Sequence, residues 1–410
     1  MQVQVERVLQ FVEAIREFGG SQEKGVNRLA YSDEDMAAQE YVIKILRDLG
    51  CSVRRDAVGN IFARLPGRED LPVIAGGSHL DSVKQAGHLD GVLGVAGMLE
   101  VLRLAKQNGG LRHPLELIIF MAEESTRFGF ATVGSKLMAG KGTPDGFSKA
   151  AKSGEKTYVQ VLQERGFEPK DYLSVRLNPE GYMAFFELHI EQGRVLADTG
   201  NVVGIVENIA APTRMKITVS GMADHSGATP MGFRKDALVS GARLIVQIEE
   251  VAKKYADKGI VATVGVVDIE PGSINVIPGK VTLWTDLRGV TEDSINAAVG
   301  ELQEKVKEVA TADSISISVD VLTADKPVAL SAELAKISES VCRLNRIKYL
   351  RMNSGAGHDA MHMADLMPTS MLFVPSVEGI SHNPAEYTAP EDIAVGVKVL
   401  WETIKELDRR

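Results

Sequence analysis

The chain has 410 residues, more than one hydrophobic core usually covers, so two domains are expected. A content of 44% hydrophobic and 25% charged residues is typical of a soluble protein, and a net charge of -9 without a long Lys or Arg run argues against nucleic acid as a partner. We find no signal-peptide pattern, no membrane-spanning stretch and two widely separated cysteines, Cys51 and Cys342, and therefore expect a cytoplasmic protein.

The first 64 residues predict helices followed by strands. Apolar residues at helical spacing within 1–20 predict an N-terminal helix. A second helix is expected from Ser32, where Asp35 completes a capping-box pattern, to Gly50. The spacing of apolar residues then changes, and two strands are predicted within 52–64.

A strand, a helix and a strand follow, which predicts a parallel sheet. The strand at 71–78 delivers His79 at its end, the helix at 90–109 comes next, and the strand at 115–121 leads to the acidic pair 123–124. In open α/β sheets ligands gather at the carboxyl ends of the strands. His79 and the acidic pair are therefore expected at one edge of one sheet.

The middle of the chain changes its pattern twice. Residues 141–180 are polar and are interpreted as a surface excursion of the catalytic domain. An inserted βαββαβ unit follows, with elements predicted at 215–220, 235–255, 261–270, 279–288, 292–310 and 314–321. Such a unit usually makes one sheet with two helices on a single face.

The fold class is therefore predicted to be α/β with a discontinuous catalytic domain. Candidate ligands occur before and after the inserted unit, so the catalytic domain should span 1–211 and 325–410 and close with a helix at 390–407. It should contain a parallel-rich mixed sheet, and the inserted domain should span 212–324.

Six of the 8 histidines lie in short blocks rich in acids and glycines. These blocks are 77–81, 87–91, 188–193, 224–227, 355–359 and 381–384, and the acidic pair 123–124 joins them. Imidazole and carboxylate are the usual ligands of catalytic transition metals, and two ions bridged by one acid can activate water. The blocks together predict a two-metal hydrolytic site.

Roles can be assigned to several of these side chains from their placement. Asp81 lies two residues after His79, so it can point the same way and hold the imidazole. Asp90 begins a helix beside a glycine and is the natural bridge. Glu123 and Glu124 are adjacent and must diverge, so that one can bind a metal while the other acts as a base.

These residues also carry a family resemblance. The blocks are Gly-Ser-His-Leu-Asp-Ser at 77–82, Phe-Met-Ala-Glu-Glu at 120–124 with Arg-Phe-Gly at 127–129, Leu-His-Ile-Glu-Gln-Gly at 188–193, His-Ser-Gly-Ala-Thr-Pro-Met at 225–231, Asn-Val-Ile-Pro at 275–278 and Ser-His-Asn-Pro-Ala-Glu at 381–386. In this order, over essentially the whole chain, they resemble the hydantoinase/carbamoylase amidohydrolases of the M20 metallopeptidase class.

The resemblance implies two divalent metal ions and their ligands. It implies His79, Asp90 and His189 for one ion and Asp90, Glu124 and His382 for the other, with Glu123 as general base. Ligand type does not distinguish Zn, Mn, Co or Ni.

The resemblance also implies that the inserted domain is a lid and dimerisation domain, so a homodimer through it is expected. His225 on this domain would stabilise the oxyanion after lid closure, in some relatives from the partner subunit. The alternative is a turn histidine at a dimer surface.

Further residues are candidates for substrate binding. Arg288 could grip an α-carboxylate bidentately, or form a surface ion pair. Asn275 could bind substrate or be a turn residue, and Gln192 could hydrogen-bond a ureido group. Gly357 and His358 lie in a loop expected near the substrate, where His358 either supports the loop or touches substrate.

The predicted reaction is hydrolysis of the linear C–N amide bond of an N-carbamoyl-L-amino acid, a small ureido acid, by water activated between the ions, which releases amino acid, carbon dioxide and ammonia. Allantoate amidohydrolase is the alternative, because 354–359 and 375–380 look closer to allantoate enzymes, whereas 210–214 departs from both. An aminoacylase or peptidase of the same class and a non-catalytic metal-binding scaffold are remoter alternatives.

Overall fold

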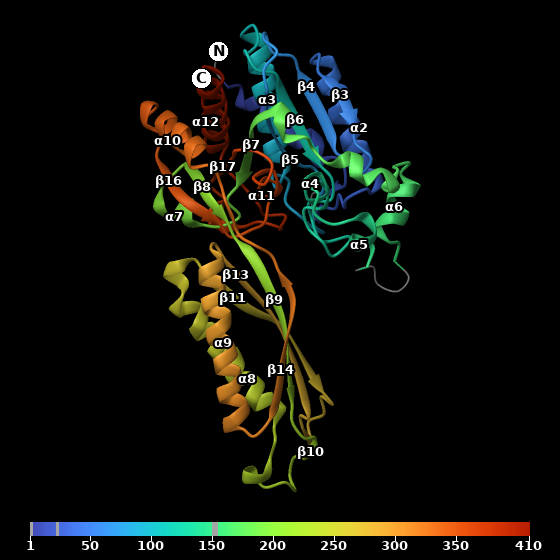
Figure 1. The fold of residues 1–410 in the computed structure, drawn as a ribbon, viewed down its shortest axis with the longest axis vertical. Helices are drawn as coiled ribbons and strands as arrows, with labels where there is room; N and C mark the ends of the chain where they lie inside the picture. Colours follow the sequence, from blue (N-terminus) through green and yellow to red (C-terminus); the bar gives the residue numbers. More distant parts are fainter. Residues whose placement is uncertain (1–2, 22–23, 150–154) are drawn as a thin grey trace. The chain divides into compact units, whose positions relative to one another are not determined.

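The computed structural model describes residues 3–21, 24–149 and 155–410 (Figure 1). The chain forms two compact units, which we call unit 1 (Met1–Glu207 with Ala329–Arg410) and unit 2 (Asn208–Val328). The boundaries between the units fall at 207/208 and 328/329 in the sequence, whereas the sequence pattern predicted them at 211/212 and 324/325. Within the described ranges, no helix has the length and apolar content needed to cross a membrane.

Unit 1 is built on a large mixed sheet with a parallel centre. The strands run in the order β15-β8-β17-β7-β5-β6-β4-β3, with β16 paired to β8. Pairs β17–β7, β7–β5 and β5–β6 are parallel, and the flanking pairs β3–β4, β4–β6 and β17–β8 are antiparallel. The bounds are β3 Ser52–Arg55, β4 Ile61–Leu65, β5 Val73–His79, β6 Leu115–Phe120, β7 Tyr182–Ile190, β8 Val203–Ile209, β15 Val328–Ala329, β16 Tyr349–Ser354 and β17 Thr369–Val374, and a separate pair joins β1 Gly20–Ser21 to β2 Gly25–Val26.

Helices cover this sheet. Helix α3 packs on β5, β6 and β7, and α12 packs on α3, β7 and β17, so their apolar faces share one core with the strands. The helices of unit 1 are α1 Val5–Arg16, α2 Asp33–Asp48, α3 Val92–Gln107, α4 Val133–Met138, α5 Pro144–Ser148, α6 Tyr158–Glu164, α7 Val195–Thr199, α10 Ala332–Leu344, α11 Ala360–Met363 and α12 Pro390–Asp408, with short 3-10 turns at Pro169–Val175, Pro179–Gly181 and Val377–Gly379.

The expected elements of the first 121 residues are confirmed, with one change in capping. Ser32 caps α2 by accepting the Asp35 N–H, but the Asp35 carboxylate accepts the Tyr31 N–H at 2.7 Å, one residue before the N-cap. Residues 1–2 of the expected first helix lie outside the described residues.

The interpretation of 141–180 as a surface excursion is wrong in part. Tyr158 of α6 is fully buried, and its hydroxyl lies 3.1 Å from that of Tyr31. Phe128 packs edge-on against both tyrosine rings, so an aromatic cluster anchors this segment to unit 1. Residues 150–154 lie outside the described residues.

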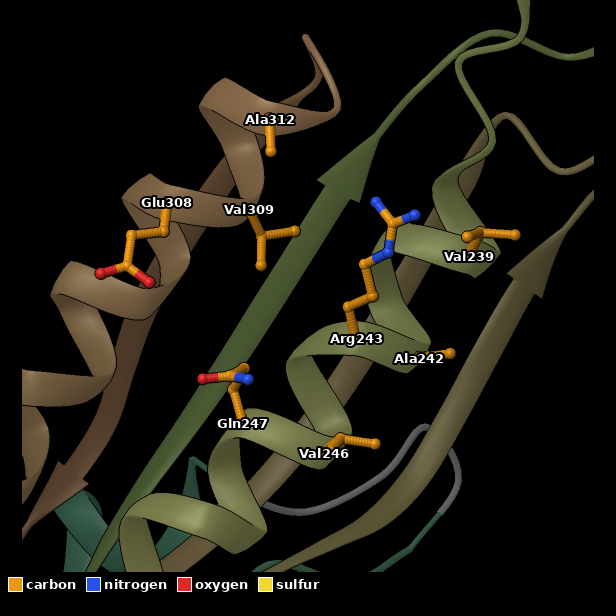
Figure 2. A pocket seen from close by; sticks show the side chains of 8 residues that line it. All are labelled: Val239, Ala242, Arg243, Val246, Gln247, Glu308, Val309 and Ala312. Carbon is orange, nitrogen blue, oxygen red and sulfur yellow. The ribbon is translucent and has the colours of Figure 1, made fainter. Parts of the chain in front are cut away.

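Unit 2 has the predicted βαββαβ order. Its antiparallel sheet runs β11-β13-β9-β14, and α8 and α9 pack on one face, where the inward residues of β13 join the core. The elements are β9 Ala211–Ser220, β10 Asp224–His225, α8 Ala237–Lys254, β11 Val261–Glu270, β12 Val276–Ile277, β13 Lys280–Gly289, α9 Glu292–Ala312 and β14 Ser316–Ala324, with 3-10 turns at Met231–Phe233 and Ala256–Lys258. Side chains of α8 and α9, among them the exposed Val239 and Val246, line an open pocket (Figure 2).

Candidate metal centre

The parallel strands of unit 1 bring the candidate ligands to one edge of the sheet. His79 is the last residue of β5 and stands opposite Phe120, the last residue of β6. His189 on β7 stands opposite Phe373 on β17. The carboxyl ends of these strands therefore meet, and the loops after them carry the acidic groups.

Asp90 lies at the centre of the cluster, with each carboxylate oxygen facing a different group. Its Oδ1 lies 3.5 Å from His79 Nε2 and 3.2 Å from His189 Nε2. Its Oδ2 lies 3.1 Å from His382 Nε2, which is 3.3 Å from Glu124 Oε1. Asp90 therefore lies between two pairs of potential metal ligands.

The donor set fits divalent cations. Nitrogen and oxygen ligands bound at about 2.1 Å around a tetrahedral ion lie about 3.4 Å apart. The three distances to Asp90 and the distance between His382 and Glu124 run from 3.1 to 3.5 Å, close to this spacing. Two groups of potential ligands share Asp90, one with His79 and His189 and the other with Glu124 and His382.

Backbone carbonyls orient two of the imidazoles. His79 Nδ1 lies 2.9 Å from the Asp81 carbonyl oxygen, and His189 Nδ1 lies 2.9 Å from that of Ile190. With its proton on Nδ1, each ring could offer the Nε2 lone pair to a metal ion.

Asp81 supports the site in a different way from the one expected. Its carboxylate is 3.8 Å from His79 Nδ1, so its carbonyl holds the imidazole instead. The carboxylate accepts the N–H of Glu123 at 3.3 Å and that of Glu124 at 3.0 Å. Asp81 therefore fixes the backbone of the acidic pair, and burial raises the pKa of its carboxyl to about 7.

The acidic pair diverges as expected. Glu123 Oε2 lies 3.8 Å from His79 Nε2, whereas Glu124 faces His382. Ala122 has a φ of 54°, a left-handed conformation that turns the chain sharply after β6. Both carboxylates are buried.

The cluster is strongly polarised. Burial opposes ionisation of Asp90, but hydrogen bonds from three facing imidazoles hold its carboxyl pKa well below the usual range. Hydrogen bonds to Asp90 and Glu124 raise the pKa of His382 to about 10. Burial raises the pKa of Glu123 well above its usual range; His79 opposes that rise and Glu124 adds to it. Divalent cations that bind these side chains would compete with the protons that the side chains share.

Gly91 leaves space for the His79 ring. A Cβ at Gly91 would lie 2.4 Å from His79 Cε1, and the residue has a φ of 68°. Both the contact and the backbone conformation require glycine at this position.

The substrate candidates of unit 1 lie around the same cluster. The Gln192 side-chain amide donates to Asp90 Oδ2 at 2.7 Å. His358 is buried, its Nε2 lies 2.9 Å from Ser354 Oγ, and its ring packs edge-on against His189 at 4.7 Å between centroids. Gly357 is exposed in the preceding loop.

The remaining candidates belong to unit 2. His225 is exposed, and its Nδ1 accepts two N–H groups, from Gly227 at 3.0 Å and Ala228 at 3.1 Å. The neutral ring therefore carries its proton on Nε2, where it can donate. Asn275 is exposed near His225, and its carbonyl accepts the Ser226 N–H at 3.1 Å.

Arg288 makes two contacts with Asp286 on the same strand. Its Nε lies 3.0 Å from Oδ1 and its Nη2 lies 3.4 Å from Oδ2. Arg214 Nε lies 3.4 Å from the same Oδ2, so two guanidinium groups share one carboxylate. The pair forms a positively charged group on the sheet face opposite the helices of unit 2.

Sequence reasoning left several contributing residues without a role. Asn60 accepts the Met121 N–H at 2.9 Å and so supports the turn before the acidic pair. Glu187 is buried, accepts the Ser78 hydroxyl at 2.8 Å, and lies two residues before His189. Glu386 contacts the Asp90 backbone. For Glu187 and Glu386 the available signal was an acid inside or beside a histidine block. The other three histidines have partners elsewhere: His88 lies 3.8 Å from Glu13, His113 lies 2.7 Å from the Pro72 carbonyl oxygen, and His362 lies 2.9 Å from the Thr132 hydroxyl.

Comparison with known proteins places the chain in a family. The model of peptidase family M20/M25/M40 matches residues 77–406. The chain is 36% identical to a ureidoglycolate hydrolase of Arabidopsis thaliana over 97% of this chain and 85% of that protein. It is 35% identical to an N-carbamoyl-L-amino acid amidohydrolase of Geobacillus stearothermophilus over 99% of each chain. It is 36% identical to an allantoate amidohydrolase of Escherichia coli (strain K12) over 93% of each chain.

A solved structure agrees with this assignment. The hydantoinase/carbamoylase family amidase of Burkholderia multivorans superposes with a TM-score of 0.91 and 32% identity, covering 99% of this chain and 98% of that chain. The chain therefore belongs to peptidase family M20/M25/M40, within which it is a metal-dependent amidohydrolase of the hydantoinase/carbamoylase group. The resemblance seen in the sequence and the expectation of a hydrolase acting on C–N amide bonds are confirmed.

Proposed function

We propose that this enzyme hydrolyses the linear C–N amide bond of an N-carbamoyl-L-amino acid and releases the amino acid, carbon dioxide and ammonia. The observation that carries this proposal is the position of Asp90 between two groups of ligands, with the buried Glu123 beside His79. The N-carbamoyl-L-amino acid amidohydrolase of Geobacillus stearothermophilus, similar over 99% of each chain, supports the choice of substrate.

The donor set supports two divalent ions that share Asp90. His79 and His189 would complete one site, and Glu124 and His382 the other. When bound, the two ions supply Lewis-acid chemistry, which polarises a carbonyl group and makes a neighbouring water more acidic. Gln192 would keep the bridging carboxylate oriented through its amide, which donates to Asp90 Oδ2.

Glu123 would act as the general base and then the general acid. Its carboxylate would accept a proton from the attacking water and return it to the leaving nitrogen. Asp81 fixes the Glu123 and Glu124 backbones, so the two carboxylates keep their different directions.

Two residues of unit 2 have chemistry suited to the rest of the substrate. We propose that His225 donates from Nε2 to the oxygen that becomes negative in the tetrahedral state, because its Nδ1 is already occupied by two N–H groups. We propose that Arg288 binds the substrate carboxylate, and that Asn275, Gly357 and His358 line the remainder of the substrate site.

Allantoate and ureidoglycolate are the competing substrates. Each has a ureido group on a carbon that also bears a carboxylate, so the proposed contacts would serve all three classes. Relatives named for these two activities are 36% identical to this chain, and they keep both alternatives open. A peptidase or aminoacylase activity is a more remote alternative.

Ammonia release from a substrate panel tests the proposal. Metal-replete enzyme would be assayed with N-carbamoyl-L-amino acids, N-carbamoyl-β-alanine, allantoate and ureidoglycolate, with chelator-treated enzyme as the blank. The proposal expects the highest kcat/KM for an N-carbamoyl-L-amino acid. A higher kcat/KM for allantoate or ureidoglycolate would make that compound the substrate in place of an N-carbamoyl-L-amino acid. If none of these compounds released ammonia, the assignment as a ureido hydrolase would be contradicted.

We also propose that two chains form a homodimer through unit 2, as the family resemblance implies. The exposed Val239 and Val246 on α8 support an apolar contact there (Figure 2). Sedimentation analysis should give twice the 44.3 kDa chain mass, and a V239E/V246E double variant should sediment as a monomer. A monomeric wild-type protein would contradict this proposal.

A further inference from the structure

Glu386 is a buried carboxylate whose hydrogen bonds are directed at the ligand segments. The residue is 2% exposed. Its Oε1 accepts the N–H of Leu89 at 2.9 Å and that of Asp90 at 3.2 Å, and its Oε2 accepts the Ser381 hydroxyl at 3.1 Å. The Glu386 side chain therefore holds both the backbone of Asp90, which the two ligand groups share, and Ser381, the residue before His382.

Ser381 strengthens this connection. Its Oγ also lies 3.3 Å from Asp90 Oδ2, the oxygen that faces His382. The Ser381 hydroxyl thus lies between two carboxylates, and Glu386 reaches Asp90 both directly through the backbone and indirectly through Ser381.

The loop before Asp90 is shaped to receive this carboxylate. A Cβ at Gly87 would lie 2.3 Å from Glu386 Oε1 and 2.4 Å from its Cδ. Any side chain there would push Glu386 away from the Leu89 and Asp90 amides. The close approach indicates a built contact between segments almost 300 residues apart, since Glu386 and Asp90 are separated by 296 positions.

The two ligand groups differ in how much support they receive. His79 and His189 lie on strands, and backbone carbonyls fix both rings. His382 lies in a loop with a φ of 54°, and its side chain is 48% exposed. The position of His382 relative to Asp90 must therefore be fixed from outside the sheet, and the hydrogen bonds of Glu386 and Ser381 connect these two segments.

We propose that Glu386 is a positioning residue that sets the affinity of the second ion, the one held by Asp90, Glu124 and His382. This inference depends on the two-ion centre proposed above. Loss of Glu386 leaves two buried N–H groups without an acceptor and removes a contact that holds the 381–386 segment. Binding of the second ion should therefore weaken, while binding of the first ion is retained.

Cobalt titration of the full-length protein tests this inference. Chelator-treated wild type, E386A and E386Q would be titrated with Co²⁺, with bound cobalt measured by elemental analysis and by visible absorption. Wild type is expected to bind two equivalents. In E386A the second should bind about 10 to 100-fold more weakly. E386Q should recover most of the affinity, because its carbonyl oxygen can still accept both N–H groups and its amide can donate to Ser381.

Asp408 offers a matched control. It is 5% exposed and its carboxylate also accepts two backbone N–H groups, from Arg112 at 3.2 Å and from His113 at 2.9 Å. D408A should lose a comparable amount of stability and still bind two equivalents of cobalt. If E386A does not fold, S381A removes the contacts of the Ser381 hydroxyl with Asp90 and Glu386, leaves the two backbone hydrogen bonds of Glu386 in place, and should weaken binding of the second equivalent.

The outcomes separate the two proposals. Wild type that binds fewer than two equivalents contradicts the two-ion centre itself, and the inference with it. Wild type with two equivalents and E386A or S381A with unchanged affinities overturns only the role of Glu386. Equal loss of cobalt in E386A and D408A also overturns it, because the effect would then come from stability alone.

Discussion

Glu123 and Glu124 are neighbours in the sequence with different surroundings. Glu124 faces His382, whereas Glu123 lies 3.8 Å from His79 Nε2. The E123Q substitution should keep both ions and lower kcat by at least about 100-fold, because an amide cannot accept and return the proton. Metal analysis and steady-state kinetics on the same sample check this, and an active, fully metallated E123Q enzyme would remove Glu123 from the mechanism.

The G91A substitution tests whether the His79 ring needs the space beside Gly91. G91A should cost about 1–2 kcal/mol from the left-handed backbone and also weaken metal binding, since the new Cβ would lie 2.4 Å from the ring. Gly200 has a similar φ of 65°, and a Cβ there would meet nothing within 4 Å, so G200A isolates the backbone cost. Equal metal affinity in the two variants would show that the contact with His79 is unimportant.

At the residue scale, the sequence indicated which side chains belong to the site better than it indicated their hydrogen-bond partners. The residue types in the blocks were sufficient to propose His79, Asp90, His189 and the acidic pair. Asp81 was expected to act through its carboxylate, but its carbonyl holds the imidazole, and carbonyl direction depends on local backbone angles that the sequence does not specify. Glu386 contacts Asp90 across 296 positions, a separation at which no local pattern indicates pairing.

At the element scale, regular patterns were predictable and interrupted ones were not. The helices α2, α3 and α12 and the elements of unit 2 follow clear periodicity. Strand β7 was missed because the buried polar residues Glu187 and His189 interrupt its apolar run. Strands β16 and β17 and helix α10 were also missed, and the two strands have only six residues each.

The loop between β3 and β4 supports the acidic pair and contains a buried titratable group, Asp56. Asp56 accepts the Asn60 side-chain amide at 2.7 Å, and this orients Asn60 to accept the Met121 N–H. Burial raises the pKa of Asp56 to about 6, and hydrogen bonds from Asn60 and Val58 only partly oppose it. The folded state thus binds this proton more tightly than the unfolded state does.

The sign of the resulting pH dependence follows from that difference. As pH rises from about 4 to 6, the unfolded carboxyl ionises first, so the free energy of unfolding of wild type should fall relative to D56N. The expected change is about 1–3 kcal/mol, since one pKa unit corresponds to about 1.4 kcal/mol. Urea unfolding of both proteins at several pH values measures it, and a constant difference across this range would contradict the shifted pKa.

At the scale of the whole molecule, the proposed roles divide between two units with separate cores. The candidate ligands belong to unit 1, whereas His225 and Arg288 belong to unit 2. R288K should keep the metal content and raise KM by at least about 10-fold with a smaller change in kcat, because lysine retains the charge and loses the two-point contact. Unchanged KM for a carboxylate substrate would exclude Arg288 from binding it.

Stepwise restoration of metal tests the central claim most directly. Chelator-treated enzyme would receive increasing amounts of one divalent ion, while ammonia release from the best ureido acid is measured. The two-ion centre around Asp90 predicts no activity without metal and full activity at two equivalents per chain. Full activity in the metal-free enzyme, or a plateau at one equivalent, would contradict it.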